Sequence, residues 1–323
     1  MTPVLPCFYP TTTVLIDDDI DTLESLIQVL DLKKKPHHVF IDPREGLRYI
    51  QENTYYKTFS KDMMYRDEED LDEVLSFHPK ILLDEIKNPQ RYHQVSVLII
   101  DYEMPGIDGL KICQAIDNPY IKKIMLTGVA DEKMAISAFN QGLIYQYVRK
   151  QDPDFIENLQ YMVDKAQKAY FQDIFDVAIK ILRNKFLNTA IIEPDFKIYF
   201  EELVRKHNIV EYYMVEEIGS FLMVDQNQTI HSLITFDKNL MESHCEIVLT
   251  EDLTHQQIDD ITQHKLMPCA YDPIKRPHFQ ISNLSEYLQV PTIIEGQTST
   301  FYCAFGEGFI FFSPDMAIFH KFS

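Results

Sequence analysis

Short apolar runs alternate with amphipathic segments through the first half of the chain. Residues 20–30, for example, repeat their apolar side chains at helical spacing from Leu23 to Leu30. The run VSVLII at 95–100 is apolar at nearly every position, as in a parallel strand buried on both faces. Strands that alternate with helices in this way predict a doubly wound, five-stranded parallel α/β sheet. The predicted strands are 11–16, 37–42, 95–100, 122–127 and 145–150, and the predicted helices are 20–30, 43–52 and 131–141.

A long insertion interrupts this alternation at about residues 53–93, between the second and third predicted strands. A loop between a helix and a strand usually has about two to six residues, so this segment needs structure of its own. It contains two helical patterns, DEEDLDEVLSF at 67–77 and KILLDEIK at 80–87. We therefore expect an inserted helical pair.

One long helix is predicted from Asp152 to Phe186, because after Pro153 the segment contains neither glycine nor proline. Apolar residues recur along it at spacings of three and four, close to a heptad pattern. The stripe consists of Leu159, Val163, Ala166, Tyr170, Ile174, Val177 and Ile181. Packing within the chain and a signalling or dimerisation role both account for this periodicity, so both remain open.

Beyond Pro194 the pattern changes to mixed helices and strands, which predicts a C-terminal α+β domain. The predicted elements are a helix at 195–206, strands at 219–225 and 231–237, a helix near 252–265, and strand-like runs at 300–305 and 308–312. The whole pattern predicts an α/β domain at 11–152, a connecting helix at 153–187 and the α+β domain at 188–323.

Composition narrows the class of protein. The apolar share of 46% is typical of packed globular domains, and the formal net charge of −20 disfavours a nucleic-acid surface or an anionic membrane face. The five scattered cysteines form no CxxC pair, so neither a zinc site nor a disulfide framework is indicated. The first residues do not resemble a signal peptide, and no apolar run approaches the length of a membrane span. We expect a soluble, cytoplasmic protein.

Polar side chains follow four of the five predicted strands where each strand ends. They are Asp17 with Asp18, Asp101, Thr127 and Lys150. Because ligands of open parallel sheets bind beyond the carboxyl ends of the strands, we expect these groups to converge on one pocket. Three neighbouring carboxylates repel one another, and Mg²⁺ relieves that repulsion while keeping sites for phosphate oxygens. A central carboxylate can then attack phosphorus and form an acyl phosphate.

The runs VLIDDD, VLIIDYEMPGIDG, KKIMLTG and YQYVRK, in this order, resemble the receiver domain of bacterial two-component response regulators. Any single run is a weak signal, since DDD before a helix is often only an N-cap and MPG only a turn. Their order and their places on strand ends make the combination specific. The resemblance covers roughly residues 11–170, with the insertion interrupting it.

The resemblance implies roles for individual residues. Asp101 is the expected phosphoacceptor, Thr127 and Lys150 contact the phosphoryl group, and Tyr147 occupies the aromatic switch position. The expected protein ligands of Mg²⁺ are Asp17, Asp18, Asp101 and the backbone carbonyl of Glu103. Pro105–Gly106 and Asp108–Gly109 match the loop that follows the phosphoacceptor. The expected partners are a sensor histidine kinase or a phosphotransfer protein in a phosphorelay, together with a second copy of the chain.

The sequence departs from the family where Gln151 replaces the proline that usually follows the conserved lysine. This change is expected to loosen the placement of Lys150 without removing its charge. An atypical receiver that signals without phosphate is therefore an alternative.

The C-terminal domain contains no GGDEF-like, EAL-like, HD-type or Walker A run and no basic helix-turn-helix pair. The combination of Gly219–Ser220 with Asp225 faintly resembles the start of a nucleotidyltransferase site but lacks the second acidic residue. Two hypotheses therefore remain for the output domain. It acts by protein interaction or dimerisation, with no enzymatic activity, or it is a divergent nucleotide-binding or enzymatic domain. The layout of the whole chain also resembles quorum-sensing response regulators of the Legionella type.

Overall fold

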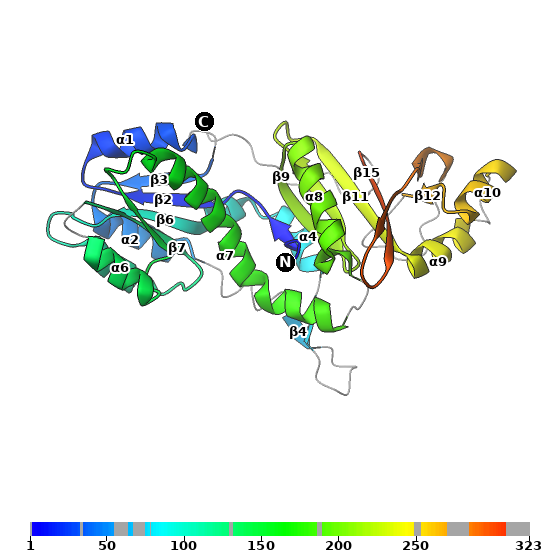
Figure 1. Cartoon of the computed structure of the whole chain (residues 1–323), viewed down its shortest axis with the longest axis horizontal. Coiled ribbons are helices and arrows are strands. Elements are labelled where there is room, and N and C mark those ends of the chain that lie inside the picture. The colour runs from blue at the N-terminus through cyan, green and yellow to red at the C-terminus, as the bar shows by residue number, and fades with distance from the viewer. Residues whose placement is uncertain are drawn as a thin grey trace. The chain divides into compact units, whose positions relative to one another are not determined.

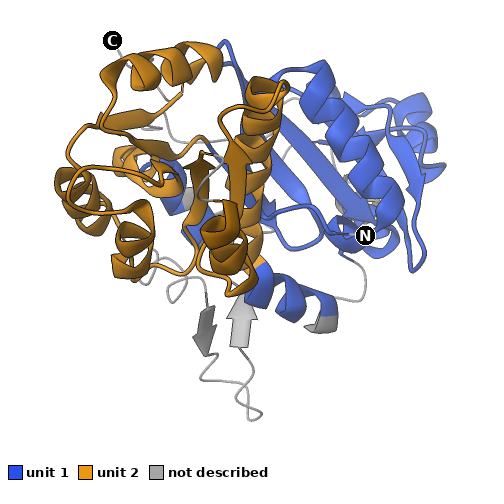
Figure 2. Ribbon diagram, turned by 60° about the vertical axis from the view of Figure 1, so that its left-hand side comes forward, with its two compact units in different colours: residues 1–9, 62–88, 176–318 blue, residues 10–61, 89–175, 319–323 orange. Residues whose placement is uncertain are grey.

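The computed structural model divides the chain into two compact units, each described here by itself (Figure 2). Unit 1 comprises residues 1–9, 62–88 and 176–318, and unit 2 comprises residues 10–61, 89–175 and 319–323. The structure describes residues 2–32, 35–54, 64–66, 75–77, 79–128, 132–185, 189–248, 253–269 and 284–307.

Unit 2 is built on a five-stranded parallel sheet with the order β3-β2-β6-β7-β8. Numbered along this unit the order is 2-1-3-4-5, the flavodoxin-like arrangement. The strands are β2 (Thr12–Ile16), β3 (His37–Phe40), β6 (Val95–Asp101), β7 (Lys122–Thr127) and β8 (Gln146–Arg149). The helices are α1 (Ile20–Val29), α2 (Pro43–Glu52), η2 (Pro89–His93), α5 (Gly109–Ala115), α6 (Glu132–Asn140) and the first part of α7 (Phe155–Lys185). The predicted fold class of the N-terminal half is confirmed.

The sheet of unit 2 separates two apolar cores, one on each face. Strand β6 is buried at all of its positions, and its side chains alternate between the two cores. Leu98 and Ile100 belong to the core that also contains residues of α2, α5 and α6, whereas Val97 and Ile99 belong to the core that contains residues of α1 and α7. Figure 1 shows α1, α2, α6 and α7 around the sheet. Each fully buried side chain of this size contributes about 1.5–3 kcal/mol. This burial on both faces explains why polar and apolar residues do not alternate in the segment 95–100.

Helix α7 confirms the predicted long helix. Its first turns bury Leu159, Val163 and Ala166 in the core of unit 2. Further along, Val177 is 45% exposed and Leu182 is fully buried instead. The first part of the apolar stripe therefore packs within its own unit.

Unit 1 contains a six-stranded antiparallel sheet with the order β1-β9-β10-β11-β15-β14, which confirms the predicted α+β class. The strands are β1 (Cys7–Phe8), β9 (Ile209–Glu216), β10 (Ser220–Asp225), β11 (Ile230–Asp237), β14 (Thr292–Glu295) and β15 (Thr300–Gly306). The helical elements are α4 (Pro79–Ile86), η3 (Ala190–Ile192), α8 (Pro194–Lys206), α9 (Lys238–Val248), α10 (His255–Thr262) and η4 (Leu284–Tyr287). The unit also contains the last part of α7 and two small strand pairs, β12 (Met267–Pro268) with β13 (Leu288–Gln289) and β4 (Met64–Arg66) with β5 (Leu75–Phe77). The predicted run at 308–312 lies outside the described residues.

The insertion differs from the predicted helical pair. Helix α4 is present, but residues Leu75–Phe77 form a strand, β5, that pairs with β4 (Met64–Arg66). The remainder of that predicted helix, 67–74, lies outside the described residues. The apolar spacing of so short a segment fits the period of a helix and that of a strand. Pairing with β4 gives hydrogen-bond partners to the backbone N–H and C=O groups that would otherwise bond within a helical turn.

Part of the insertion packs against the sheet of unit 1. Helix α4 packs against β9, and strand β1 pairs with the same strand. Unit 1 is therefore assembled from three stretches of sequence. The predicted domain limits of 11–152 and 188–323, which treat each domain as one stretch, remain a prediction.

Candidate functional site

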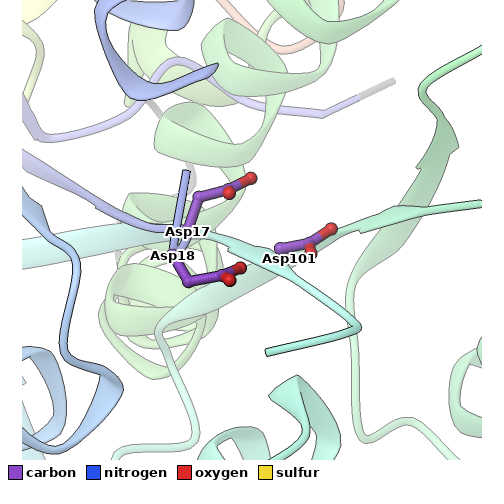
Figure 3. Close-up of side chains that lie close together, drawn as sticks. All are labelled: Asp17, Asp18 and Asp101. Carbon is purple, nitrogen blue, oxygen red and sulfur yellow. The ribbon is translucent and has the colours of Figure 1, made fainter. Parts of the chain in front are cut away.

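The carboxyl ends of β2, β6, β7 and β8 lie side by side because these strands are neighbours in the sheet. Asp17 and Asp18 follow β2, Asp101 ends β6, and carboxylate oxygens of all three lie within 4.8 Å of one another. Figure 3 shows the three side chains extending in the same direction, with the Asp18 carboxylate directed toward Asp101. Asp17 and Asp101 are buried, whereas Asp18 is exposed. The sequence prediction that these strand ends converge is correct.

Lys150 is the cation of this cluster. Its Nζ lies 2.8 Å from Asp101 Oδ1 and 3.0 Å from Asp17 Oδ2. Burial lowers the pKa of Lys150, but its hydrogen bonds to Asp101 and Asp17 outweigh burial and raise the pKa overall. The presence of Gln151 in place of proline therefore leaves Lys150 in contact with both carboxylates.

The surroundings of Asp101 disfavour the ionised form of its carboxyl group. Burial raises the pKa of its carboxyl group, the hydrogen bond from Lys150 lowers it, and the net shift is upward. One ammonium faces three carboxylates, so the cluster retains an excess of negative charge. Carboxylate oxygens in this number suit Mg²⁺, which binds through one or two carboxylates and keeps its other positions for water or phosphate oxygens. The donor set fits the metal that the sequence predicted.

Thr127 supplies a hydroxyl without a partner. Its Oγ1 is buried and has no hydrogen-bond partner among the described residues. A buried hydroxyl in this state costs about 1–3 kcal/mol. Thr127 ends β7, which lies between β6 and β8, so it stands at the same end of the sheet as Asp101 and Lys150.

The third aspartate of the DDD run has a structural role. The Asp19 side chain caps α1, accepting hydrogen bonds from the Asp21 backbone N–H at 3.1 Å and the Thr22 hydroxyl at 2.7 Å. These bonds, led by the one from Thr22, lower the pKa of Asp19. The Asp19 backbone N–H in turn donates to Asp17 Oδ1 at 3.0 Å, which fixes the Asp17 carboxylate. The N-cap reading of this run is thus right for one residue of the three.

Gly109 allows the chain to pass close to the backbone of Asp101, a role that the sequence did not reveal. A Cβ at this position would overlap the carbonyl oxygen of Asp101. The Gly109 N–H donates to the Tyr102 carbonyl at 2.9 Å, and Asp108 caps α5 by accepting from the Lys111 N–H at 2.9 Å. The Asp-Gly pair directly before a helix was the available signal, since it marks an N-cap beside a residue without a side chain.

Two predicted site residues, Glu103 and Tyr147, are not part of the acidic cluster. Glu103 is exposed, and the role of its backbone carbonyl as a metal ligand stays a prediction. Tyr147 is half-buried, and its ring meets Phe139 of α6 edge-on with centroids 6.4 Å apart. Both rings line a hollow of about 500 Å³ beside α6, β8 and α7. The switch role of Tyr147 also stays a prediction.

The candidate nucleotidyltransferase residues do not form a site. Ser220 and Asp225 occupy opposite ends of β10. The Ser220 hydroxyl accepts from the Thr235 N–H at 3.0 Å. Asp225 accepts backbone N–H groups of the following turn and pairs with His231 at 3.3 Å. Both side chains hold the β10–β11 hairpin together.

Residues 78–160 match the family model of the response regulator receiver domain. Strands β2 and β3 precede the matched range, yet they belong to the same sheet. Unit 2 therefore contains a receiver domain of the response regulator type.

Nearly the whole chain is also similar to a solved structure, that of the Legionella pneumophila response regulator LqsR. The two share 29% sequence identity with a TM-score of 0.75, over 97% of this chain and 92% of that chain. A receiver domain protein from Clostridium thermocellum matches at 21% identity and a TM-score of 0.33, over 49% of this chain and 94% of its own. No match was found among curated proteins.

No helix in the described part of the chain combines the length and apolarity needed to span a bilayer.

Proposed function

We propose that Asp101 accepts a phosphoryl group from a sensor histidine kinase or a phosphotransfer protein, in a step that requires Mg²⁺. The observation that supports this most is the combination at one sheet edge of a buried Asp101, its Lys150 partner and the unpartnered hydroxyl of Thr127. A structural ion pair would account for Asp101 and Lys150. It would not explain why the buried hydroxyl of Thr127 lacks a hydrogen-bond partner.

In the proposed reaction an Asp101 carboxylate oxygen attacks the phosphorus of a phosphohistidine. The new bond joins this oxygen to phosphorus, and the phosphorus–nitrogen bond breaks with its electron pair going to the imidazole. Asp17, Asp18, Asp101 and the Glu103 carbonyl would hold Mg²⁺, which neutralises charge on the phosphoryl oxygens when bound. Lys150 neutralises further charge, and Thr127 donates its hydroxyl to a phosphoryl oxygen.

The product changes what surrounds Asp101. Once Thr127 bonds the phosphoryl group, the loop after β7 is drawn inward and Tyr147 turns toward the space that is vacated. This shift alters the face formed by α6, β8 and α7. A coupling of about 1–3 kcal/mol between the two conformations is enough to bias an output.

The same face is the proposed surface for homodimerisation. Its helices carry exposed apolar side chains, Met134 and Phe139 on α6 and Tyr161 on α7, and Tyr161 is 66% exposed. Exposed apolar side chains are typical of protein interaction sites when they form a patch. The output domain would act through such interactions rather than through enzymatic activity, in the cytoplasm. The similarity to LqsR supports a place in Legionella-type quorum sensing.

Intact-mass measurement after incubation with acetyl phosphate and Mg²⁺ tests the proposal. The wild-type chain should gain the mass of one phosphoryl group, and Asp101→Asn should gain none. Light scattering with and without beryllofluoride, a mimic of the phosphoryl group, tests the dimer separately. A wild-type chain that stays unmodified with donor and Mg²⁺ in excess excludes the phosphoryl switch.

A further inference from the structure

Two consecutive basic residues, Arg149 and Lys150, stand at the end of strand β8 in unit 2 and contact different partners. Lys150 contacts Asp101 and Asp17 of the acidic cluster. Arg149 contacts the first residue of α6 instead, with 3.4 Å between Arg149 Nη1 and Glu132 Oε1. Neighbouring residues of the chain therefore contact the acidic cluster and helix α6.

A second carboxylate, Asp152, holds Arg149 from the connection that leads to α7. Arg149 Nε lies 3.1 Å from Asp152 Oδ1, and the Asp152 N–H donates to the Arg149 carbonyl at 3.1 Å. We call Arg149 together with Glu132 and Asp152 the Arg149 bridge. Because a backbone hydrogen bond reinforces the closer pair with Asp152, we expect the pair with Glu132 to open first.

Helix α6 rests on the sheet of unit 2 through small side chains. The buried residues of α6 are Ala135 and Ala138, and an alanine buries much less apolar area than a leucine or a phenylalanine does. The larger apolar side chains of this helix, Met134, Ile136 and Phe139, are each at least 38% exposed. Contacts at the two ends of α6 therefore carry more weight in fixing its position.

Both ends of α6 are tied to β8. The Phe139 ring meets the Tyr147 ring near the end of the helix, with centroids 6.4 Å apart, and Glu132 pairs with Arg149 at its start. Tyr147 and Arg149 are two positions apart on the strand, so their side chains point to the same face of the sheet. All four side chains line the hollow of about 500 Å³, which leaves space for α6 to move once a contact opens.

The start of α6 is also connected to the hydroxyl side chain proposed to bind the phosphoryl group. Only residues 128–131 separate Thr127 from Glu132 along the chain. Thr127 is the register partner of Arg149 in the pairing of β7 with β8. Displacement of Thr127 toward Asp101 is expected to pull Glu132 with it, whereas Arg149 stays with β8.

We propose that the Arg149 bridge holds α6 in the position of the unphosphorylated receiver, and that phosphorylation of Asp101 opens the pair between Arg149 and Glu132. This inference rests on the phosphorylation of Asp101 proposed above. Because the pair favours the unphosphorylated conformation, its removal favours the phosphorylated one. The two side chains are 45% and 36% exposed, so the shift in this equilibrium should be modest, about two- to fivefold.

Amide hydrogen exchange of the full-length chain, read in peptides covering 132–140, tests the restraint without any phosphoryl group. Glu132→Gln should speed exchange there about two- to fivefold, because the ion pair no longer holds the start of the helix. Glu157→Gln is the matched control. It removes the same charge from the exposed first turn of α7 and should leave exchange in 132–140 unchanged. Unchanged exchange in Glu132→Gln overturns the proposal.

A double-mutant cycle assigns the effect to the ion pair. Glu132→Gln also removes a negative charge from the N-terminus of α6, which weakens a helix by itself. Arg149→Gln should speed exchange in 132–140 by a similar factor, and adding Glu132→Gln to that variant should change little. Fully additive effects of the two substitutions would show that Arg149 and Glu132 act independently, against the proposal.

Binding of beryllofluoride with Mg²⁺ tests the connection to phosphorylation. Glu132→Gln should reach half-saturation at a concentration about two- to fivefold lower than the wild-type chain, whereas a merely destabilised receiver would need more. Glu157→Gln should match the wild type. Equal half-saturation in Glu132→Gln and the wild type means that the bridge does not respond to phosphorylation.

Failure of the proposed function gives a different result. A wild-type chain that binds no beryllofluoride, together with faster exchange in Glu132→Gln, supports the restraint of α6 by the Arg149 bridge and refutes the phosphorylation of Asp101.

Discussion

The ammonium nitrogen of Lys150 lies 2.8 Å from Oδ1 of Asp101, so the chain itself supplies a cation to the expected phosphoacceptor. The pair has two consequences. It stabilises a carboxylate whose burial raises its pKa. It also means that replacing Lys150 removes the cation that contacts these carboxylates in the described part of the chain.

Lys150→Met should therefore lower thermal stability without Mg²⁺ and gain more stability from Mg²⁺ than the wild-type chain does. In the variant the ion takes over the neutralisation of the three carboxylates from the Lys150 ammonium, so its binding is linked more strongly to folding. Phosphorylation by acetyl phosphate should slow by at least about tenfold, because one charge on the transferring group is no longer neutralised. Thermal unfolding with and without Mg²⁺ and intact-mass time courses measure the two effects.

Lys111→Met is the matched control, since the exposed Lys111 pairs with Asp108 at 3.2 Å outside the cluster. It should behave like wild type in both measurements, because an exposed pair contributes about 0–1 kcal/mol. Equal responses of the two variants to Mg²⁺ contradict the assignment of Lys150 as the cation of the cluster.

Thr127→Val is expected to stabilise the unphosphorylated chain by about 1 kcal/mol, because it replaces an unsatisfied buried hydroxyl with a methyl group of similar size. Urea unfolding measures this change. The same substitution should impair the response to phosphorylation, while Thr127→Ser, which keeps a hydroxyl, should preserve it. A destabilised Thr127→Val would mean that the hydroxyl already has a partner in solution.

Gly109→Ala should destabilise the chain by about 2–3 kcal/mol, because the added Cβ overlaps the carbonyl oxygen of Asp101 and the backbone must move. Gly142→Ala is the control, since Gly142 has a φ of +70° but open space around it. Its cost should be limited to the left-handed backbone, about 1–2 kcal/mol. Urea unfolding of both variants separates the two causes, and equal losses would show that crowding at Asp101 is unimportant.

The strand ends of the receiver could be predicted because their signals are local. The apolar run before Asp101 and the amphipathic segments around it fix the parallel sheet, and the sheet alone brings Asp17 to Asp101 and Lys150. The geometry of individual groups could not be predicted. Without the family resemblance, nothing in the run of three aspartates distinguishes Asp19, which caps a helix, from Asp17, which accepts a hydrogen bond from the Lys150 ammonium.

The segments of the chain that make up unit 1 could not be predicted either, for a different reason. Strand β1 is only Cys7–Phe8, between two prolines, and its partner Tyr213 lies some two hundred residues away. Helix α4 was predicted, but its docking on β9 depends on a contact of similar range. Such pairings are decided by the tertiary fold and leave no periodic signal in the sequence.

The half-buried His244 in α9 should make the stability of unit 1 depend on pH. Burial lowers the pKa of its imidazole, while Nδ1 lies 3.0 Å from the Leu240 carbonyl and the ring packs against Phe236. In the unfolded chain the pKa of histidine is about 6.5, so below that pH the unfolded state binds the proton more tightly than the folded state. The contribution of His244 is therefore complete above about pH 6.5 and is lost as the pH falls toward its folded pKa.

His244→Gln should consequently flatten the dependence of the free energy of unfolding on pH below about 6.5, because the substituted side chain takes up no proton. His255→Gln, at the exposed start of α10, is the control and should keep the slope of the wild-type chain. Urea unfolding at a series of pH values gives the two slopes. An unchanged slope in His244→Gln would show that the imidazole is already solvated in the folded chain, and that other groups cause its loss of stability in acid.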